Sequence, residues 1–240
     1  MLKVDAETPF LSIGDSSKVA VGSPIVAVGY AMDLPLSPTF GTVAGIEMRL
    51  HDRYFATRHI RANVCVQRGQ GGAPLLNMQG DVVGVLIANL EGSACFGLPI
   101  EAAEKIRKDY VRHGDTRRGF LGIGVEPAPV SAIGSTAAIG DLTADSPGEK
   151  GGLKPGDVIL QINNHSISSP EDVLNAAFFI APEDDVKLRI ARGKETLNFD
   201  LTAESRPSAP GAARTAGEIP MFLPGSSSDL RAFIPADLDR

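Results

Sequence analysis

Short apolar runs separated by Gly, Pro and Asn dominate the first hundred residues. Five of them lie between residues 19 and 99: SPIVAVGY, FGTVAGIEM, HIRANVCVQ, APLLNMQGDVVGVLIANL and SACFGLPI. Runs of this length with turn residues between them are typical of strands in an antiparallel barrel or sandwich. Within the fourth run, Gln79-Gly80 separates two apolar stretches, and glycine supplies the positive φ that a tight turn needs. We therefore expect a hairpin over residues 75–90.

The hydrophobic period changes at residue 100. Ile100, Ala103, Ile106 and Tyr110 recur at helical intervals, and Gly114 stands just beyond them in the position of a C-terminal cap. This pattern predicts a helix from Ile100 to His113 that acts as a spacer between two β-rich domains. His113 would lie in its last turn, where a cation is favourable against the helix dipole.

Residues 120–202 show a second set of strand signals. An apolar strand FLGIGV precedes the segment GLKPGDVILQIN, and VKLRIAR and ETLNFDLTA read as closing strands. Between them a helix is expected to begin at Ser169-Pro170, because serine can cap a helix and proline suits its first position. Beyond Ala203, SRPSAPGAARTAGEIP is poor in large apolar residues and rich in Pro, Gly, Ala and Ser, which predicts a flexible tail. The apolar clusters MFLP and LRAFIP follow in that tail.

Length, composition and charge narrow the classes of function. A chain of 240 residues with 43% apolar residues is long enough for two modest cores. Its formal charge of -6 argues against binding to nucleic acid, which normally requires a basic face. No stretch approaches the roughly 18 to 20 apolar residues of a membrane span. The N-terminus MLKVDAETPF does not read as a signal peptide, so we expect no export signal and no membrane span.

The two cysteines give no metal or disulfide signal. Cys65 and Cys95 are too few for a disulfide framework, and neither has metal-ligand spacing with a histidine. We expect core thiols, no metal and no cofactor, and leave open whether the two cysteines pair. His165, in Asn-Asn-His-Ser, is expected in a hairpin turn.

Four segments carry a family resemblance. LSIGDSSKVAVGSPIVAVG, RGQGGAPLLNMQGDVVGVLI, FGLPIEAAEKI and RRGFLGIGVEP resemble, in order, successive segments of the HtrA (DegP/DegQ) family, over residues 2–204. The resemblance implies a mainly β fold: the second β-barrel of a trypsin-like protease domain, with the first barrel mostly missing, then a linker helix and an α+β PDZ domain. The implied boundaries are a partial protease domain at 1–100, a linker helix at 101–116, a PDZ domain at 117–204 and a flexible tail at 205–240.

The family resemblance also locates the position of the nucleophile. Trypsin-like catalysis needs a serine nucleophile, a histidine base, an orienting acid and backbone donors for the oxyanion. The family places its serine in Gly-Asn-Ser-Gly-Gly-Pro, whereas residues 69–74 here read Gly-Gln-Gly-Gly-Ala-Pro. Gly71 therefore stands at the nucleophile position, and glycine has no side chain with which to attack a carbonyl. Gly69 and Gln70 are read as a vestigial oxyanion turn that serves mainly the fold rather than as an anion-binding nest.

The other two members of the triad are also expected to be missing. The family order is His, Asp, Ser, and residues 1–5 resemble the last strand of the first barrel, so all four histidines of the chain follow that point. By its spacing, Asp5 is expected to be a turn residue. His51 and His59 fall in or beside a loop that responds to ligands in the family, and we expect solvated or structural roles for them.

A barrel without its partner exposes apolar surface, and we expect something to cover it. The candidates are the C-terminal tail, a second copy of the chain or a separately encoded protein. Because the family's trimer contacts come largely from N-terminal parts of the protease domain, the usual trimer is not expected.

The PDZ-like segment is expected to bind peptides. Its FLGI sequence resembles a carboxylate-binding loop, in which backbone N–H groups hold a terminal carboxylate while the next strand pairs with the peptide. A helix from Pro170 to about Ile180 would form the other wall of the groove. Alternatively this helix buries its apolar face and leaves no open groove. Arg117 and Arg118 precede the loop and are placed to attract an anionic peptide end. The expected peptide-binding residues are Phe120, Leu121, Gly122, Ile123, Val173 and Ala177.

These expectations support three hypotheses about function. The first is an inactive HtrA-like homologue that binds C-terminal or extended peptides of client proteins through its PDZ domain. The second is a serine endopeptidase of protein quality control that is active only with a missing upstream or partner barrel. The third is a gene fragment whose upstream barrel and export signal have been omitted. The family points to the periplasm or cell envelope, but this chain shows no route there, so its compartment stays open.

Overall fold

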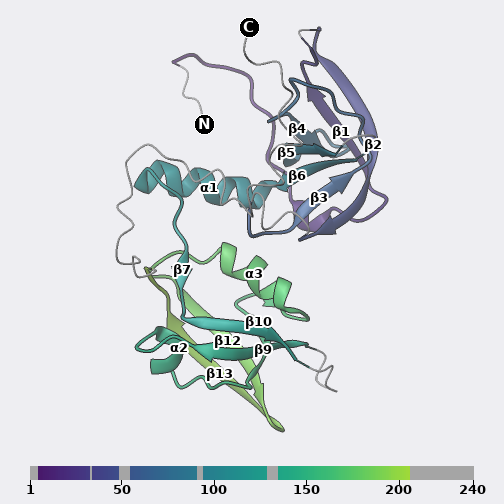
Figure 1. Ribbon diagram of the computed structural model, residues 1–240. Helices are drawn as coiled ribbons and strands as arrows, with labels where there is room; N and C mark the ends of the chain where they lie inside the picture. Colours follow the sequence, from purple (N-terminus) through teal and green to yellow (C-terminus); the bar gives the residue numbers. More distant parts are fainter. Residues whose placement is uncertain (1–4, 33, 49–54, 91–93, 129–134, 206–240) are drawn as a thin grey trace, which may run out of the picture.

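The computed structural model describes residues 5–32, 34–48, 55–90, 94–128 and 135–205. They form two units, which we call the barrel (residues 5–99) and the C-terminal unit (residues 119–205), with a long helix between them (Figure 1). In this part of the chain no helix is both long enough and apolar enough to cross a membrane.

The barrel is closed and antiparallel. Its strands follow the order β1-β2-β3-β6-β5-β4, and a short 3₁₀ helix, η1 (Ser16–Lys18), precedes them. The strand bounds are β1 (Pro24–Gly29), β2 (Ser37–Glu47), β3 (His59–Ala62), β4 (Pro74–Leu76), β5 (Val82–Leu90) and β6 (Ala94–Pro99). The expected hairpin is confirmed, because β4 pairs with β5 and Gly80 has a φ of 86° in the turn between them.

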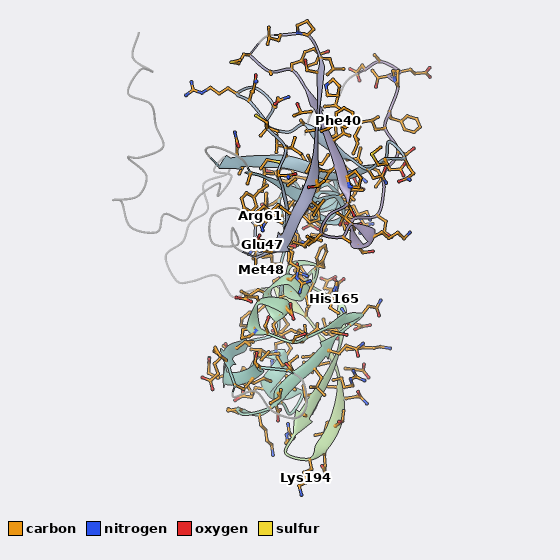
Figure 2. The ribbon with its side chains drawn as sticks, turned by 90° about the vertical axis from the view of Figure 1, so that its right-hand side faces the viewer. Phe40, Glu47, Met48, Arg61, His165 and Lys194 are labelled. Carbon is orange, nitrogen blue, oxygen red and sulfur yellow. The ribbon has the colours of Figure 1, made fainter. Side chains whose placement is uncertain are left out.

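The interior of the barrel is packed tightly. Ile25, Ile60 and Leu75 are among its fully buried side chains. A Cβ at Gly97 would lie 2.2 Å from the Leu75 side chain, so any side chain there would force the buried leucine to move. On the outside, Arg61 of β3 forms an ion pair with Glu47 of β2, and Figure 2 shows the two residues side by side.

The cysteines differ in burial. The prediction of two core thiols is wrong for Cys65, which is exposed, while Cys95 on β6 is fully buried. The neighbours Val64 and Val66 are buried, and consecutive side chains of an extended segment point to opposite sides, so Cys65 faces outward. Both thiols are free, and burial raises the pKa of Cys95.

Helix α1 (Ile100–His113) ends where the sequence predicts. Gly114 adopts the left-handed conformation with a φ of 72°, and its N–H donates to the Tyr110 carbonyl at 2.9 Å. The helix is more than the expected spacer, because it packs against β5 and β6 and also joins an apolar cluster with Phe178 of the C-terminal unit. Its buried Asp109 accepts hydrogen bonds from Lys105 and from the Arg117 N–H, which fastens the helix to the segment that follows.

The C-terminal unit is an α+β domain. The order of its main sheet is β13-β12-β10-β9-β8, with β11 paired to β10, and β14 pairs with β7 in a separate two-stranded sheet. Its strands are β7 (Gly119–Phe120), β8 (Ile123–Pro127), β9 (Ala137–Leu142), β10 (Val158–Ile162), β11 (His165–Ser166), β12 (Asp185–Arg192), β13 (Glu195–Thr202) and β14 (Glu204–Ser205), and its helices are α2 (Pro147–Lys150) and α3 (Pro170–Phe178). A single apolar core that includes Ile139, Ile159 and Leu188 lies within this unit.

Two local features of this unit refine the expectations. Helix α3 begins at Pro170 as predicted, and ends at Phe178, two residues before the expected Ile180. The hairpin turn lies at Asn163-Asn164, so His165 is the first residue of β11 rather than part of the turn. Its ring stacks on Phe179 with centroids 5.9 Å apart, and it lies where the two units meet, whereas Lys194 marks the far end of the C-terminal unit (Figure 2).

Candidate functional site

An apolar cavity of about 180 Å³ opens between β8, α3 and the segment that joins β7 to β8. All six residues expected to bind a peptide line it, which means that the structure brings together two segments about fifty residues apart. It is also lined by Ile159, Ile162 and Ile180, which no sequence pattern indicates as binding residues. The full lining is Gly119, Phe120, Leu121, Gly122, Ile123, Ile159, Ile162, Val173, Ala177 and Ile180.

The loop at the entrance holds its carbonyls away from the cavity. The Leu121 carbonyl accepts from the Gly148 N–H at 2.9 Å, and the Gly122 carbonyl accepts from the Thr143 N–H at 2.8 Å. Among the residues that the structure describes, no acceptor takes the N–H of Leu121 or Gly122. Two adjacent backbone donors without partners are suited to hold an anionic group such as a carboxylate.

Glycine is required at the centre of this loop. Gly122 has a φ of 71°, and a Cβ there would lie 2.1 Å from the Cβ of Ser146. Ser146 itself caps α2 by accepting from the Glu149 N–H, so it cannot move away without loosening that helix. Backbone conformation and lack of space therefore both exclude a side chain at position 122.

Helix α3 contributes to the core and to the cavity at once. Val173 and Ala177 are four residues apart on the face toward the cavity, and Val173 is also part of the buried core. An opening therefore remains beside β8, and the role of these helix residues in peptide binding stays a prediction. In the described part of the sheet β8 is an end strand, which leaves one edge available for another strand.

The barrel holds α3 from the other side. The Asn175 side-chain oxygen accepts from the Thr57 hydroxyl and from the Arg58 N–H, both at 2.9 Å. The Arg58 guanidinium forms an ion pair with Asp172, and the ring of Phe55 packs edge-on against Phe178. Contacts with the barrel, in addition to contacts within the C-terminal unit, thus fix the position of α3, which forms one wall of the cavity.

Asp172 links the start of α3 to the barrel. Its carboxylate accepts from the N–H groups of Ser168 at 2.8 Å and Ser169 at 3.2 Å, in addition to the ion pair with Arg58. Burial by itself raises the pKa of Asp172, but the Ser168 hydrogen bond and the Arg58 charge outweigh it and hold that pKa below its ordinary value. The ionised form of Asp172 is therefore the one that the fold stabilises.

The two arginines before the loop are exposed and partly committed elsewhere. The Arg118 guanidinium lies 5.7 Å from the centre of the Phe178 ring, and the Arg117 N–H donates to Asp109. Their expected attraction for an anionic peptide end stays a prediction.

The segment expected to hold a vestigial oxyanion turn consists of two successive tight turns. The Gln70 N–H donates to the Gln67 carbonyl at 3.3 Å, and the Ala73 N–H donates to the Gln70 carbonyl at 3.0 Å. Gly69 and Gly72 occupy the third positions of the turns with φ values of 92° and 83°, as type II turns require. The Gln70 side chain is buried and accepts from the Gln67 N–H, which ties the segment to the fold.

Gly71 is the second residue of the second turn, and the space beside it is open. A Cβ placed on it would meet no atom within 4 Å, and its φ lies outside the left-handed region. Within the described residues, the N–H groups of Gly69 and Gly71 have no acceptor. The segment can therefore donate hydrogen bonds to a carbonyl or an anion, but it presents no side chain able to attack one.

The remaining candidate residues belong to elements other than this turn. His59 is buried on β3, His113 ends α1 and His165 begins β11, and none of these elements pairs with β4, which follows the turn. Asp5 is exposed in a bend, and His51 lies outside the described residues. In the part of the chain that the structure describes, no group of three or more His, Cys, Asp or Glu residues is arranged to hold a metal ion.

Known proteins resemble both units. Residues 1–85 match the trypsin-like peptidase domain family and residues 119–202 match the PDZ domain family. A protein of Halomonas elongata named probable periplasmic serine endoprotease DegP-like is 31% identical over 232 residues, which cover 91% of this chain and 49% of that protein. A protein of the same name from Chlamydia pneumoniae is 29% identical over 225 residues, covering 88% of this chain and 46% of that protein.

Solved structures agree on the fold. The HtrA-type protease AlgW with a tripeptide has a TM-score of 0.66 and 22% identity, over 87% of this chain and 74% of that chain. The chain spans about half the length of the curated relatives it matches. These matches confirm the expected mainly β fold, in which a trypsin-like domain precedes a PDZ domain, as well as the resemblance on which it was based.

Proposed function

Because this chain is a homologue of the DegP-like, HtrA-type serine endoproteases, we propose that it binds C-terminal or extended peptides of client proteins through its PDZ domain and does not cut them. The observation that carries the proposal is the apolar cavity beside the N–H groups of Leu121 and Gly122, which have no acceptor within the described part of the chain. A DegP-like endoprotease needs a nucleophile as well as a peptide site. In this chain the proposed peptide site has an apolar cavity and backbone donors, whereas the position of the nucleophile holds Gly71.

The groove, by which we mean the cavity and the adjacent edge of β8, has one feature for each part of a peptide end. The N–H groups of Leu121 and Gly122 would donate hydrogen bonds to the terminal carboxylate, and the exposed edge of β8 would pair with the peptide backbone. The last side chain would enter the cavity, whose lining is apolar apart from the backbone. A terminal apolar residue with a free carboxylate therefore fits better than a charged or amidated one. The HtrA-type structure with a tripeptide supports peptide recognition in a relative of the same fold.

The proposed lack of cleavage depends on Gly71. Covalent catalysis needs a side-chain oxygen at this position, and glycine offers none, whatever else surrounds it. The donors at Gly69 and Gly71 would at most hold a peptide carbonyl by hydrogen bonds. Binding without cleavage is the outcome this arrangement favours.

A titration tests peptide binding. Fluorescent decapeptides that end in a valine, a leucine or an aspartate would be titrated with the full chain, each as the free acid and as the C-terminal amide. We expect the valine or leucine acids to bind, and amidation to weaken binding at least tenfold because the loop then loses its anionic partner. If none of these acids binds up to millimolar protein, the peptide-binding function is wrong.

The alternative function is a serine endopeptidase that is active only when a partner chain supplies the missing first barrel. The observation in its favour is the number of large apolar side chains exposed on the barrel, which a partner chain would cover. They include Phe10, Val21, Tyr30, Met32, Leu36, Phe40 and Met78. Casein turnover by the wild-type chain, alone or mixed with a separately produced first barrel, would contradict the role assigned to Gly71, and turnover in the mixture only would support this alternative.

A further inference from the structure

The chain leaves the PDZ domain beside the entrance of its own groove. Strand β14 pairs with β7, so that Glu204 lies opposite Phe120 and Ser205 lies opposite Gly119. Phe120 and Gly119 line the cavity. Whatever follows residue 205 therefore starts next to the proposed carboxylate-binding loop.

The sequence after residue 205 contains an apolar segment at a suitable distance. Residues 206–220 include Ile219 as their one large apolar residue, and Met-Phe-Leu-Pro follows at residues 221–224. In an extended strand Met221 and Leu223 point to the same side, so both can face an apolar groove. Proline has no N–H and cannot continue the pairing, so Pro224 sets the end of the paired stretch.

The intervening length is sufficient to reach the groove. A flexible chain of the 15 residues from 206 to 220 has a root-mean-square span of roughly 20 Å. The five residues of β8 extend over roughly 16 Å. The span of the connection thus exceeds the length of β8 only slightly, and a tether of matching span gives a tethered ligand its highest local concentration, in the millimolar range.

We propose that the segment from Met221 to Pro224 occupies the PDZ groove of its own chain, as an added strand on β8, and competes with client peptides. The proposal rests on the proposed function, because it uses the same groove. An internal segment brings no terminal carboxylate, so the N–H groups of Leu121 and Gly122 stay without an anionic partner. Each contact is therefore weaker than that of a free C-terminus, and a client peptide displaces the segment.

Two full-length variants test this occupant. Met221→Ser combined with Leu223→Ser removes both side chains that face the groove, whereas Phe222→Ser removes an apolar side chain that points away from it. We expect the double variant to bind a decapeptide ending in valine about tenfold more tightly than the wild type, because a tethered competitor at millimolar concentration is lost. The Phe222→Ser control should bind within about twofold of wild type. Matched melting temperatures would show that all three proteins are folded.

The outcomes separate this proposal from the proposed function. If all three proteins bind the decapeptide equally well, peptide binding stands and the competing segment is wrong. If none of them binds it, the peptide-binding function itself fails. A gain in affinity that disappears on dilution of the protein would place the segment in the groove of a second copy, which contradicts occupancy within one chain.

Discussion

The turn around Gly71 and the loop around Gly122 are built from the same elements and differ in what surrounds them. Each combines glycines with two backbone N–H groups that have no acceptor among the described residues, those of Gly69 and Gly71 in the turn and those of Leu121 and Gly122 in the loop. At Gly71 the space beyond the backbone is open, whereas Gly122 is enclosed by Ser146 and Thr143. The loop at Gly122 also borders an apolar cavity and a free strand edge.

This difference shows that backbone N–H donors alone give neither tight binding nor cleavage. Hydrogen-bond donors can orient a carbonyl or a carboxylate, but affinity needs apolar contact and cleavage needs a nucleophile. The Gly122 loop has the apolar contact beside it, and the Gly71 turn has no nucleophile. Substitutions at the two glycines should therefore differ widely in the size of their effects.

The largest effect is expected from Gly122→Val. The new side chain meets Ser146 and forces a positive φ on a β-branched residue, which together should cost about 2–4 kcal/mol of unfolding free energy. Peptide affinity should fall more than tenfold, because the loop can no longer keep its donors in place. Urea denaturation and peptide titration measure the two effects. Wild-type stability in this variant would show that the loop is not packed as described.

An intermediate effect is expected from Asp172→Asn, which changes the contact between the groove wall and the barrel. Loss of the ion pair with Arg58 and weaker hydrogen bonds to Ser168 and Ser169 should lower the unfolding free energy by about 1–2 kcal/mol at pH 7. The matched control is Glu171→Gln, because residue 171 is exposed and one position away on the same helix turn.

The contact between Asp172 and Arg58 predicts that the free energy of unfolding depends on pH. The pKa of Asp172 is lowered in the folded state from its ordinary value of 3.8. The ionised carboxylate therefore contributes fully to the free energy of unfolding above pH 3.8, and this contribution is lost as the pH falls through the lowered pKa. The stability gap between wild type and Asp172→Asn should therefore shrink between pH 4 and the lowered pKa. A gap that stays constant as the pH falls through this range would contradict the assigned charge state.

The smallest effect is expected from Gly71→Ser. A Cβ at this position meets no neighbour, so the unfolding free energy should change by less than about 0.5 kcal/mol. We also expect no labelling by a fluorophosphonate probe, because no described histidine lies on an element that pairs with the neighbouring strand β4. Labelling of this single variant would reveal a base that the proposal does not include, with trypsin as the positive control.

Local signals explain which parts of the fold were predictable. The hairpin at Gly80, the end of α1 at Gly114 and the start of α3 at Pro170 each depend on residues adjacent in sequence, and all three are confirmed. The outward position of Cys65 was not predictable, because alternation in a strand does not say which side faces the core until the barrel closes.

Features that depend on long-range contacts were not predictable from the sequence. The cavity lining from Ile159 and Ile162 depends on the position of β10 in the sheet, which no local pattern encodes. The contact between Arg58 and Asp172 joins residues 114 positions apart, in different domains. The six groove residues were identified through the family resemblance, and their role in binding stays a prediction.

One measurement tests binding without cleavage most directly. The wild-type chain would be saturated with a decapeptide that ends in a free valine carboxylate, binding would be followed by calorimetry, and the peptide would then be recovered for mass spectrometry. The proposed function predicts saturable binding and a peptide of unchanged mass after prolonged incubation. Absence of binding, or recovery of cleaved fragments that a heat-denatured sample does not produce, would contradict it.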